Sequence, residues 1–121
     1  MKIKTFEDLE VYQLSIELSK LVYQIVNKLP TREKFNIINQ LIRAVTSIGA
    51  NIAEGFGRDT TKEFIKFLYN ARGSLMEVRH FVNLLVELKY FNRNELVELY
   101  ELGNRLGVKL NNLIRVLKPK Q

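Results

Sequence analysis

Residues 61–89 read TKEFIKFLYNARGSLMEVRHFVNLLVELK, and the spacing of the apolar side chains in this stretch decides the fold class. Seven of them follow one another at alternating steps of four and three residues: Phe64, Leu68, Ala71, Leu75, Val78, Val82 and Leu85. That period places them on one stripe of an α-helix. Thr60 with Glu63 three residues later is a capping-box pattern, so we expect a helix over 61–89.

The same period recurs over residues 6–29, 32–55 and 93–117. The expected stripes are Val11, Leu14, Leu18, Leu21 and Ile25; Ile38, Leu41, Val45, Ile48 and Ile52; and Leu99, Gly103, Leu106, Leu110, Leu113 and Leu117. Stop and start residues separate the stretches: Pro30 then Thr31 as an N-cap, Gly55 and Gly57 as left-handed closing residues, Asn92 with Glu95, and Pro119. In the last stretch, we expect Gly103 to permit a close approach between helices, and Gly107 lies one turn later.

No stretch alternates with period two, so no sheet is expected. Connections of a few residues force neighbouring helices to run antiparallel. The chain of 121 residues is therefore predicted to be one all-α domain over 1–121, an antiparallel up-down-up-down four-helix bundle.

Composition excludes several classes of site. The chain has no cysteine, which removes disulfides and thiolate ligands. The hydrophobic fraction is 46% and no long apolar run follows the basic Met1–Lys4 segment, so we expect a cytoplasmic protein without membrane contact.

Several apolar residues lie off the four stripes. We predict a homo-oligomer interface from this surplus, because large apolar patches rarely stay exposed on a monomer. The candidates are Leu9, Tyr12, Ile16, Tyr23, Ile65, Tyr69 and Met76. Further apolar residues, Phe81, Leu84 and Leu88, lie on another side of the third helix. A wide core that absorbs these side chains is the alternative.

A column of polar residues follows the second and third helices. Its members are Ser47, Asn51, Glu54, Asn70, Ser74 and Glu77. Ser and Asn are poor formers of helix interiors, so we interpret this structural polar seam as a hydrogen-bonded network between helices or subunits. A surface that contacts a ligand or nucleic acid is the second interpretation.

The basic balance indicates an anionic partner. Nineteen Lys and Arg residues against thirteen Asp and Glu give a net charge of +6. The candidates for phosphate contacts are Arg43, Arg58, Lys62, Lys66, Arg72 and Arg79, with the terminal Lys2, Lys4, Lys118 and Lys120. Simple solubility is the alternative explanation of this charge.

No catalytic, cofactor-binding or metal-binding residue is predicted. Di-metal bundles use Glu-x-x-His pairs on two helices, and here Glu77 and His80 form the one example. Gly55-Phe56-Gly57 follows a helix rather than a strand, which does not match a phosphate loop. A pairing of Glu54 with Glu77 is the one enzymatic hypothesis.

Three stretches together resemble the 23S ribosomal RNA intervening-sequence proteins. They are Phe6–Tyr12 (FEDLEVY), Gln40–Arg58 (QLIRAVTSIGANIAEGFGR) and Phe67–Glu77 (FLYNARGSLME). The family is similar to the accessory variability protein of diversity-generating retroelements. The resemblance implies a four-helix bundle, a homopentamer and association with RNA or DNA and with a protein partner such as a reverse transcriptase. Tyr12 stands where Trp is often found.

These observations leave three functional hypotheses. The first is a non-enzymatic, oligomeric nucleic-acid or nucleoprotein binding protein that contacts phosphates through its basic surface. The second is an oligomeric scaffold that docks a protein partner without binding nucleic acid. The third is an enzyme that uses Glu54 and Glu77.

Overall fold

The computed structural model describes residues 2–120, which form four long helices and no strand. The long helices are α1 (Glu10–Val26), α2 (Asn39–Phe56), α3 (Thr61–Glu87) and α4 (Val97–Leu117). Short helical turns precede three of them: the 3-10 turns η1 (Phe6–Asp8), η2 (Thr31–Glu33) and η4 (Arg93–Leu96), and the π-helical turn η3 (Lys34–Ile38). The prediction of an all-helical fold with four helices is confirmed.

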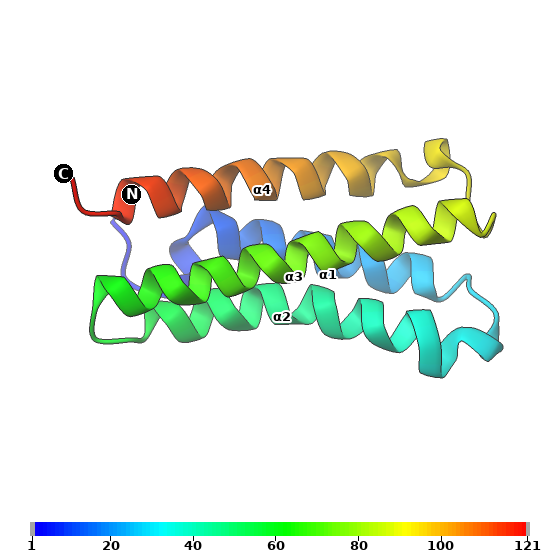
Figure 1. Cartoon of the computed structure of the whole chain (residues 1–121), viewed down its shortest axis with the longest axis horizontal. Helices are drawn as coiled ribbons and strands as arrows, with labels where there is room; N and C mark the ends of the chain where they lie inside the picture. Colours follow the sequence, from blue (N-terminus) through cyan, green and yellow to red (C-terminus); the bar gives the residue numbers. More distant parts are fainter. Residues whose placement is uncertain (1, 121) are drawn as a thin grey trace.

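The four long helices lie lengthwise beside one another (Figure 1). The connection between α2 and α3 is at the end of the molecule that also holds both termini, and the other two connections are at the opposite end. The buried apolar side chains of all four helices form one continuous core.

The first helix begins later than predicted, because the backbone at Leu9 is extended. Leu9 itself is buried in the core. The second half of the predicted stripe is displaced by one residue, so that Val22 and Val26 are buried and Leu21 and Ile25 are only half-buried. A regular helix turns every 3.6 residues, so a stripe drawn with steps of three and four drifts off the core-facing side.

The corner between α1 and α2 is not one continuous helix, contrary to the predicted helix over 32–55. Pro30 caps η2, which makes Thr31 the first residue of this turn and not its N-cap. Asn36, with φ −115° and ψ −107°, departs from helical geometry inside η3. In a regular helix Phe35 would share the stripe of Ile38, but the π-helical turn shifts the phase and leaves Phe35 82% exposed.

Small residues let α2 approach its neighbours closely. A Cβ added at Gly55 would lie 2.5 Å from the Cβ of Phe67 on α3, and one added at Gly49 would lie 2.9 Å from Oγ of Ser15 on α1. Gly55 therefore serves close packing inside the helix. The prediction that glycines end α2 in the left-handed conformation is wrong, since Gly57 has φ −80°.

The left-handed residue of the described chain is Lys89, with φ 65°. The amides of Lys89 and Tyr90 donate to the carbonyls of Val86 and Leu85, which is the pattern that closes a helix after a left-handed residue. The caps at Thr60 and Asn92 are confirmed, because each side chain accepts from the amide three residues later.

Gly103 of α4 does not provide the predicted close approach. A Cβ added there would meet nothing within 4 Å, although the residue is buried. The glycine of α4 that contacts another helix is Gly107, whose added Cβ would lie 3.5 Å from Leu75 Cδ2.

Candidate nucleic-acid interface

The six candidate basic residues fall into three places on the molecule. Four of them belong to the turn before α3 and to its first half: Arg58, Lys62, Lys66 and Arg72. Arg43 lies on α2, and Arg79 lies in the second half of α3. Lys118 of the chain terminus joins the first group, because its Nζ lies 5.4 Å from the ring centroid of Tyr69 on α3.

Aromatic rings hold three cations of this group in place. The guanidinium carbon of Arg58 lies 4.8 Å from the ring centroid of Phe67, and that of Arg72 lies 4.7 Å from the ring centroid of Tyr69. Arg72 also donates to Oδ1 of Asn111 on α4 at 2.9 Å. A stacked guanidinium keeps N–H groups at its edges free to bind an anion.

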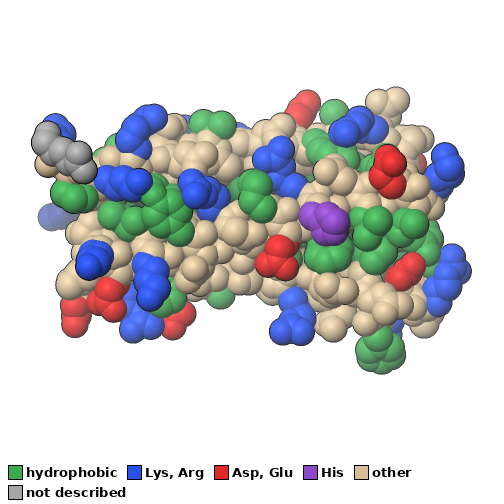
Figure 2. Space-filling view, in the orientation of Figure 1, with side chains coloured by type: hydrophobic (Ala, Val, Ile, Leu, Met, Phe, Trp, Pro, Cys, Tyr) green, Lys and Arg blue, Asp and Glu red, His purple; other side chains and the backbone are tan. Residues whose placement is uncertain are grey.

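We call Arg58, Lys62, Lys66, Arg72 and Lys118 the basic end. Figure 2 shows Lys and Arg side chains gathered around hydrophobic atoms on the half of the molecule that carries the termini. Glu54 forms an exposed ion pair with Arg58 at 3.2 Å, which is worth little in water. The five cations of the basic end outnumber the exposed Glu54, Asp59 and Glu63 beside them, and aromatic rings lie against three of these cations.

Sequence reasoning found four of these cations by charge alone and treated Lys118 only as part of a basic terminus. It did not find Phe67 or the supporting role of Tyr69. The spacing of Tyr69 and Arg72, three residues apart on a helix, was the available signal. The pairing of Lys118 with Tyr69 carried no local signal, since the two residues are far apart in the sequence.

The polar seam is divided between two environments. Ser74 of α3 donates to Oγ of Ser47 on α2 at 3.1 Å, and the side-chain amide of Asn51 donates to the same oxygen at 3.0 Å. These three residues form a small network between the helices. Asn70 is exposed, and Glu54 is engaged with Arg58.

Glu77 lines an open groove of about 710 Å³ between α2 and α3, together with Arg43, Ser47 and Ser74. Glu54 is not among the residues that line this groove. Among the residues that the structure describes, no group of three or more His, Asp or Glu side chains could hold a metal ion. His80 is exposed, with its ring 5.1 Å from that of Phe81.

The candidate interface residues also separate into two sets. Leu9 belongs to the core of the chain itself, and Tyr12, Ile65 and Tyr69 are half-buried against that core. Three remain on the surface, with exposed fractions of 42% for Ile16, 47% for Tyr23 and 46% for Met76.

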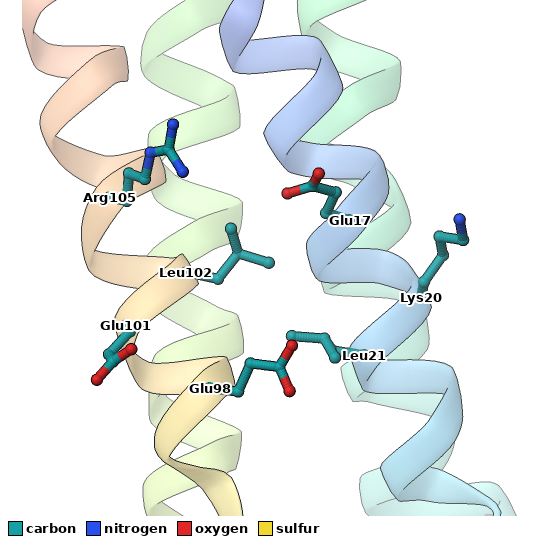
Figure 3. A pocket seen from close by; sticks show the side chains of 7 residues that line it. All are labelled: Glu17, Lys20, Leu21, Glu98, Glu101, Leu102 and Arg105. Carbon is teal, nitrogen blue, oxygen red and sulfur yellow. The ribbon is translucent and has the colours of Figure 1, made fainter.

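A second groove, between α1 and α4, has more acidic than basic side chains in its lining. Its volume is about 470 Å³, and Glu17, Glu98 and Glu101 line it with Lys20 and Arg105 around Leu21 and Leu102 (Figure 3). Arg105 is also paired with Glu10 at 3.3 Å. The three carboxylates outnumber the two cations of the lining, so this groove favours phosphate less than the basic end does.

The sequence matches the model of a known protein family. The model of the 23S rRNA-intervening sequence protein family matches residues 7–112. The chain belongs to this family. No curated protein matches the sequence.

A solved structure has the same fold as this intervening-sequence protein. It is the 1.70 Å crystal structure of a protein of unknown function from the S23 ribosomal protein family of Bacteroides thetaiotaomicron, with 26% identity and a TM-score of 0.79. The match covers 86% of this chain and 97% of the other. Within residues 2–120, no helix is long and apolar enough to cross a membrane.

Proposed function

We propose that this intervening-sequence protein is a non-enzymatic nucleic-acid binding protein that contacts phosphates through the basic end. The observation that carries the proposal is the set of cations fixed on aromatic rings: Arg58 on Phe67, and Arg72 and Lys118 on Tyr69. Such cations bind an anion with a smaller loss of side-chain freedom than mobile lysines.

Contacts to phosphates without base contacts give binding that depends little on sequence and strongly on salt. Each phosphate that a cation neutralises releases counterions from the nucleic acid. The basic end offers five cations, of which Lys62 and Lys66 lie one helical turn apart on the exposed face of α3. This arrangement suits a run of backbone phosphates rather than one base.

We further propose an up-down-up-down topology and assembly into a homo-oligomer, with a homopentamer as the expected ring. The topology agrees with the alternating ends of the connections in Figure 1. The exposed Ile16, Tyr23 and Met76 support self-association. A nucleoprotein partner such as a reverse transcriptase rests on the resemblance to the retroelement accessory protein. A cytoplasmic location is proposed because the sequence contains no long apolar run.

The test is a binding titration with a structured RNA and a duplex DNA at several salt concentrations. Lys62→Glu with Lys66→Glu is expected to lower the affinity at least about tenfold and to reduce the slope of log K against log salt by about two. The matched control is Lys20→Glu with Lys28→Glu, which changes the net charge equally at residues outside the basic end. Wild-type protein that binds neither polymer at low salt would refute the proposal.

The second candidate function is a scaffold that docks a protein partner. The exposed apolar residues Ile16, Tyr23 and Met76 favour it, since aromatic residues and Met are enriched at interfaces. This function predicts that a native lysate yields a defined protein partner, and that charge reversal at Lys62 and Lys66 leaves its capture unchanged. Recovery of no partner counts against the scaffold.

A further inference from the structure

A groove between α3 and α4 collects arginine and amide side chains. Its volume is about 420 Å³, and its polar lining consists of Arg79, Asn83, Arg93, Asn94, Tyr100 and Asn104. We call it the Arg79–Arg93 groove. It is formed by the second half of α3, by η4 and by the first half of α4, whereas the basic end lies around the first half of α3.

Arg93 is held in a fixed position at this groove. Its guanidinium carbon lies 4.6 Å from the ring centroid of Tyr100. The hydroxyl of Tyr100 donates in turn to Oδ1 of Asn83 on α3 at 3.1 Å. This chain of contacts orients the planar guanidinium and leaves its edges available for hydrogen bonds.

No carboxylate neutralises the two arginines. Over residues 2–120, no Asp or Glu oxygen lies within 4.0 Å of a nitrogen of Arg79 or Arg93, and none lines the groove. Glu95, two residues after Arg93, is engaged elsewhere: its carboxylate accepts from the amide of Asn92 at 2.8 Å. Two like charges beside one groove repel each other until an anion lies between them.

From this geometry we infer that the Arg79–Arg93 groove binds a phosphate group. Guanidinium groups match phosphate oxygens with paired N–H donors, and the side-chain amides of Asn94 and Asn104 supply further donors. The α1–α4 groove has a similar size but three carboxylates in its lining, so the two grooves differ in the charge that they would present to a phosphate. That the phosphate belongs to a nucleic-acid strand rests on the proposed function, whereas the preference for phosphate does not.

The test compares Arg79→Gln with Arg93→Gln against a control, Lys20→Gln with Lys28→Gln, which removes the same charge elsewhere. The first probe is a labelled structured RNA, titrated at several salt concentrations. The second is inorganic pyrophosphate, whose binding is measured by calorimetry. Relative to the control, the double variant Arg79→Gln with Arg93→Gln is expected to bind RNA about tenfold more weakly. Its slope of log K against log salt is expected to be smaller by about two. Circular dichroism and thermal melts check that all variants fold.

Tyr100 is a positioning residue in this inference, and two variants test it at constant net charge. Tyr100→Phe keeps the ring under Arg93 and loses only the hydrogen bond to Asn83, so its affinity for RNA is expected to fall less than that of a variant without the ring. Tyr100→Leu removes the ring, and a loss of about two- to fivefold is expected. Equal affinities of the two variants would contradict the role of the ring.

The outcomes separate the two proposals. One outcome is that the wild-type protein binds pyrophosphate but no RNA or DNA, and that the double variant Arg79→Gln with Arg93→Gln no longer binds pyrophosphate. This outcome supports the phosphate groove and overturns the proposed function. The other outcome is that Lys62→Glu with Lys66→Glu loses RNA binding, whereas Arg79→Gln with Arg93→Gln binds RNA and pyrophosphate as its control does. This outcome overturns the phosphate groove and leaves the proposed function standing.

Discussion

Lys89 occupies a backbone conformation that a side chain disfavours. With φ 65° it is left-handed, a state that costs a residue with a Cβ about 1–2 kcal/mol and costs glycine little. Lys89→Gly is therefore expected to raise the free energy of unfolding by about 1 kcal/mol, measured by urea denaturation. Lys89→Ala keeps the Cβ and loses the same charge, so a gain as large as that of glycine would contradict this explanation.

Tyr90 links the two connections at the end of the molecule remote from the termini. Its hydroxyl donates to Oε2 of Glu33 at 2.6 Å and accepts from Arg32 at 3.2 Å. The hydrogen bond to Glu33 raises the pKa of Tyr90 above its ordinary value of 10.0, because it requires the protonated phenol.

A raised pKa in the folded state sets the sign of a pH effect. The stabilisation is complete below pH 10 and is lost as the pH rises through the pKa of the folded protein. The free energy of unfolding, measured between neutral and strongly alkaline pH, should decline as the pH rises, and this decline should be smaller in Tyr90→Phe than in the wild-type protein. An identical decline in both proteins would show that this hydrogen bond is not its source.

At this scale the sequence predicted hydrogen-bonded caps and did not predict backbone angles. Thr60 and Asn92 are recognisable because each needs only an amide three residues later. The end of α3 was predicted to within two residues, but the left-handed position fell on Lys89 and not on a glycine. A residue with a Cβ gives no local signal for that conformation.

At the scale of helices, two glycines on one packed pair have opposite roles. A Cβ at Gly55 would lie 2.5 Å from that of Phe67, while a Cβ at Gly73 in the middle of α3 would meet nothing within 4 Å. Gly55→Ala is expected to cost about 1–3 kcal/mol by forcing α2 and α3 apart. Gly73→Ala is expected to stabilise the protein by up to about 1 kcal/mol.

Thermal or urea denaturation of the two alanine variants checks this pair. Each variant serves as the control for the other, because the chemical change is the same. Destabilisation by both substitutions would mean that α3 needs a glycine at position 73 for a reason other than its own packing.

The helical stripes were predictable to within one residue, and α1 and α4 show where a regular period fails. In α3 the stripe from Leu68 to Leu85 is completely buried. In α1 the buried residues move to Val22 and Val26, and at the end of α4 Ile114 is buried in place of the predicted Leu113, because nothing in the sequence specifies how strongly a helix supercoils. The candidate site was less predictable, since its aromatic supports depend on contacts such as that between Lys118 and Tyr69.

At the scale of the whole molecule, the basic end and the most acidic groove lie on different faces. The basic end lies on α3 and the end of α4, while three carboxylates line the groove between α1 and α4. A protein that uses its positive side for one partner keeps other faces free for self-association. The exposed Ile16 and Tyr23, seven residues apart on α1, are the expected centre of such an interface.

Light scattering of the wild-type protein is expected to give the mass of an oligomer. Ile16→Glu with Tyr23→Glu should reduce that mass to 14.2 kDa, because charges would have to be buried in the interface. The control, Val108→Glu with Val116→Glu, changes two α4 residues that are 58% and 76% exposed and should leave the mass unchanged. A wild-type monomer would contradict the expected oligomer.

The exposure of Phe35, which follows from the π-helical turn, makes this corner an expected site of proteolytic cleavage in the folded chain. Enzymes that cleave after aromatic residues need an accessible side chain on a segment that can leave its helix, and the corner between α1 and α2 offers both. A single cut there would release no fragment, since the buried face of α1 holds it to the other helices. Cleavage at this corner is therefore expected to give two fragments that stay packed together as one folded protein.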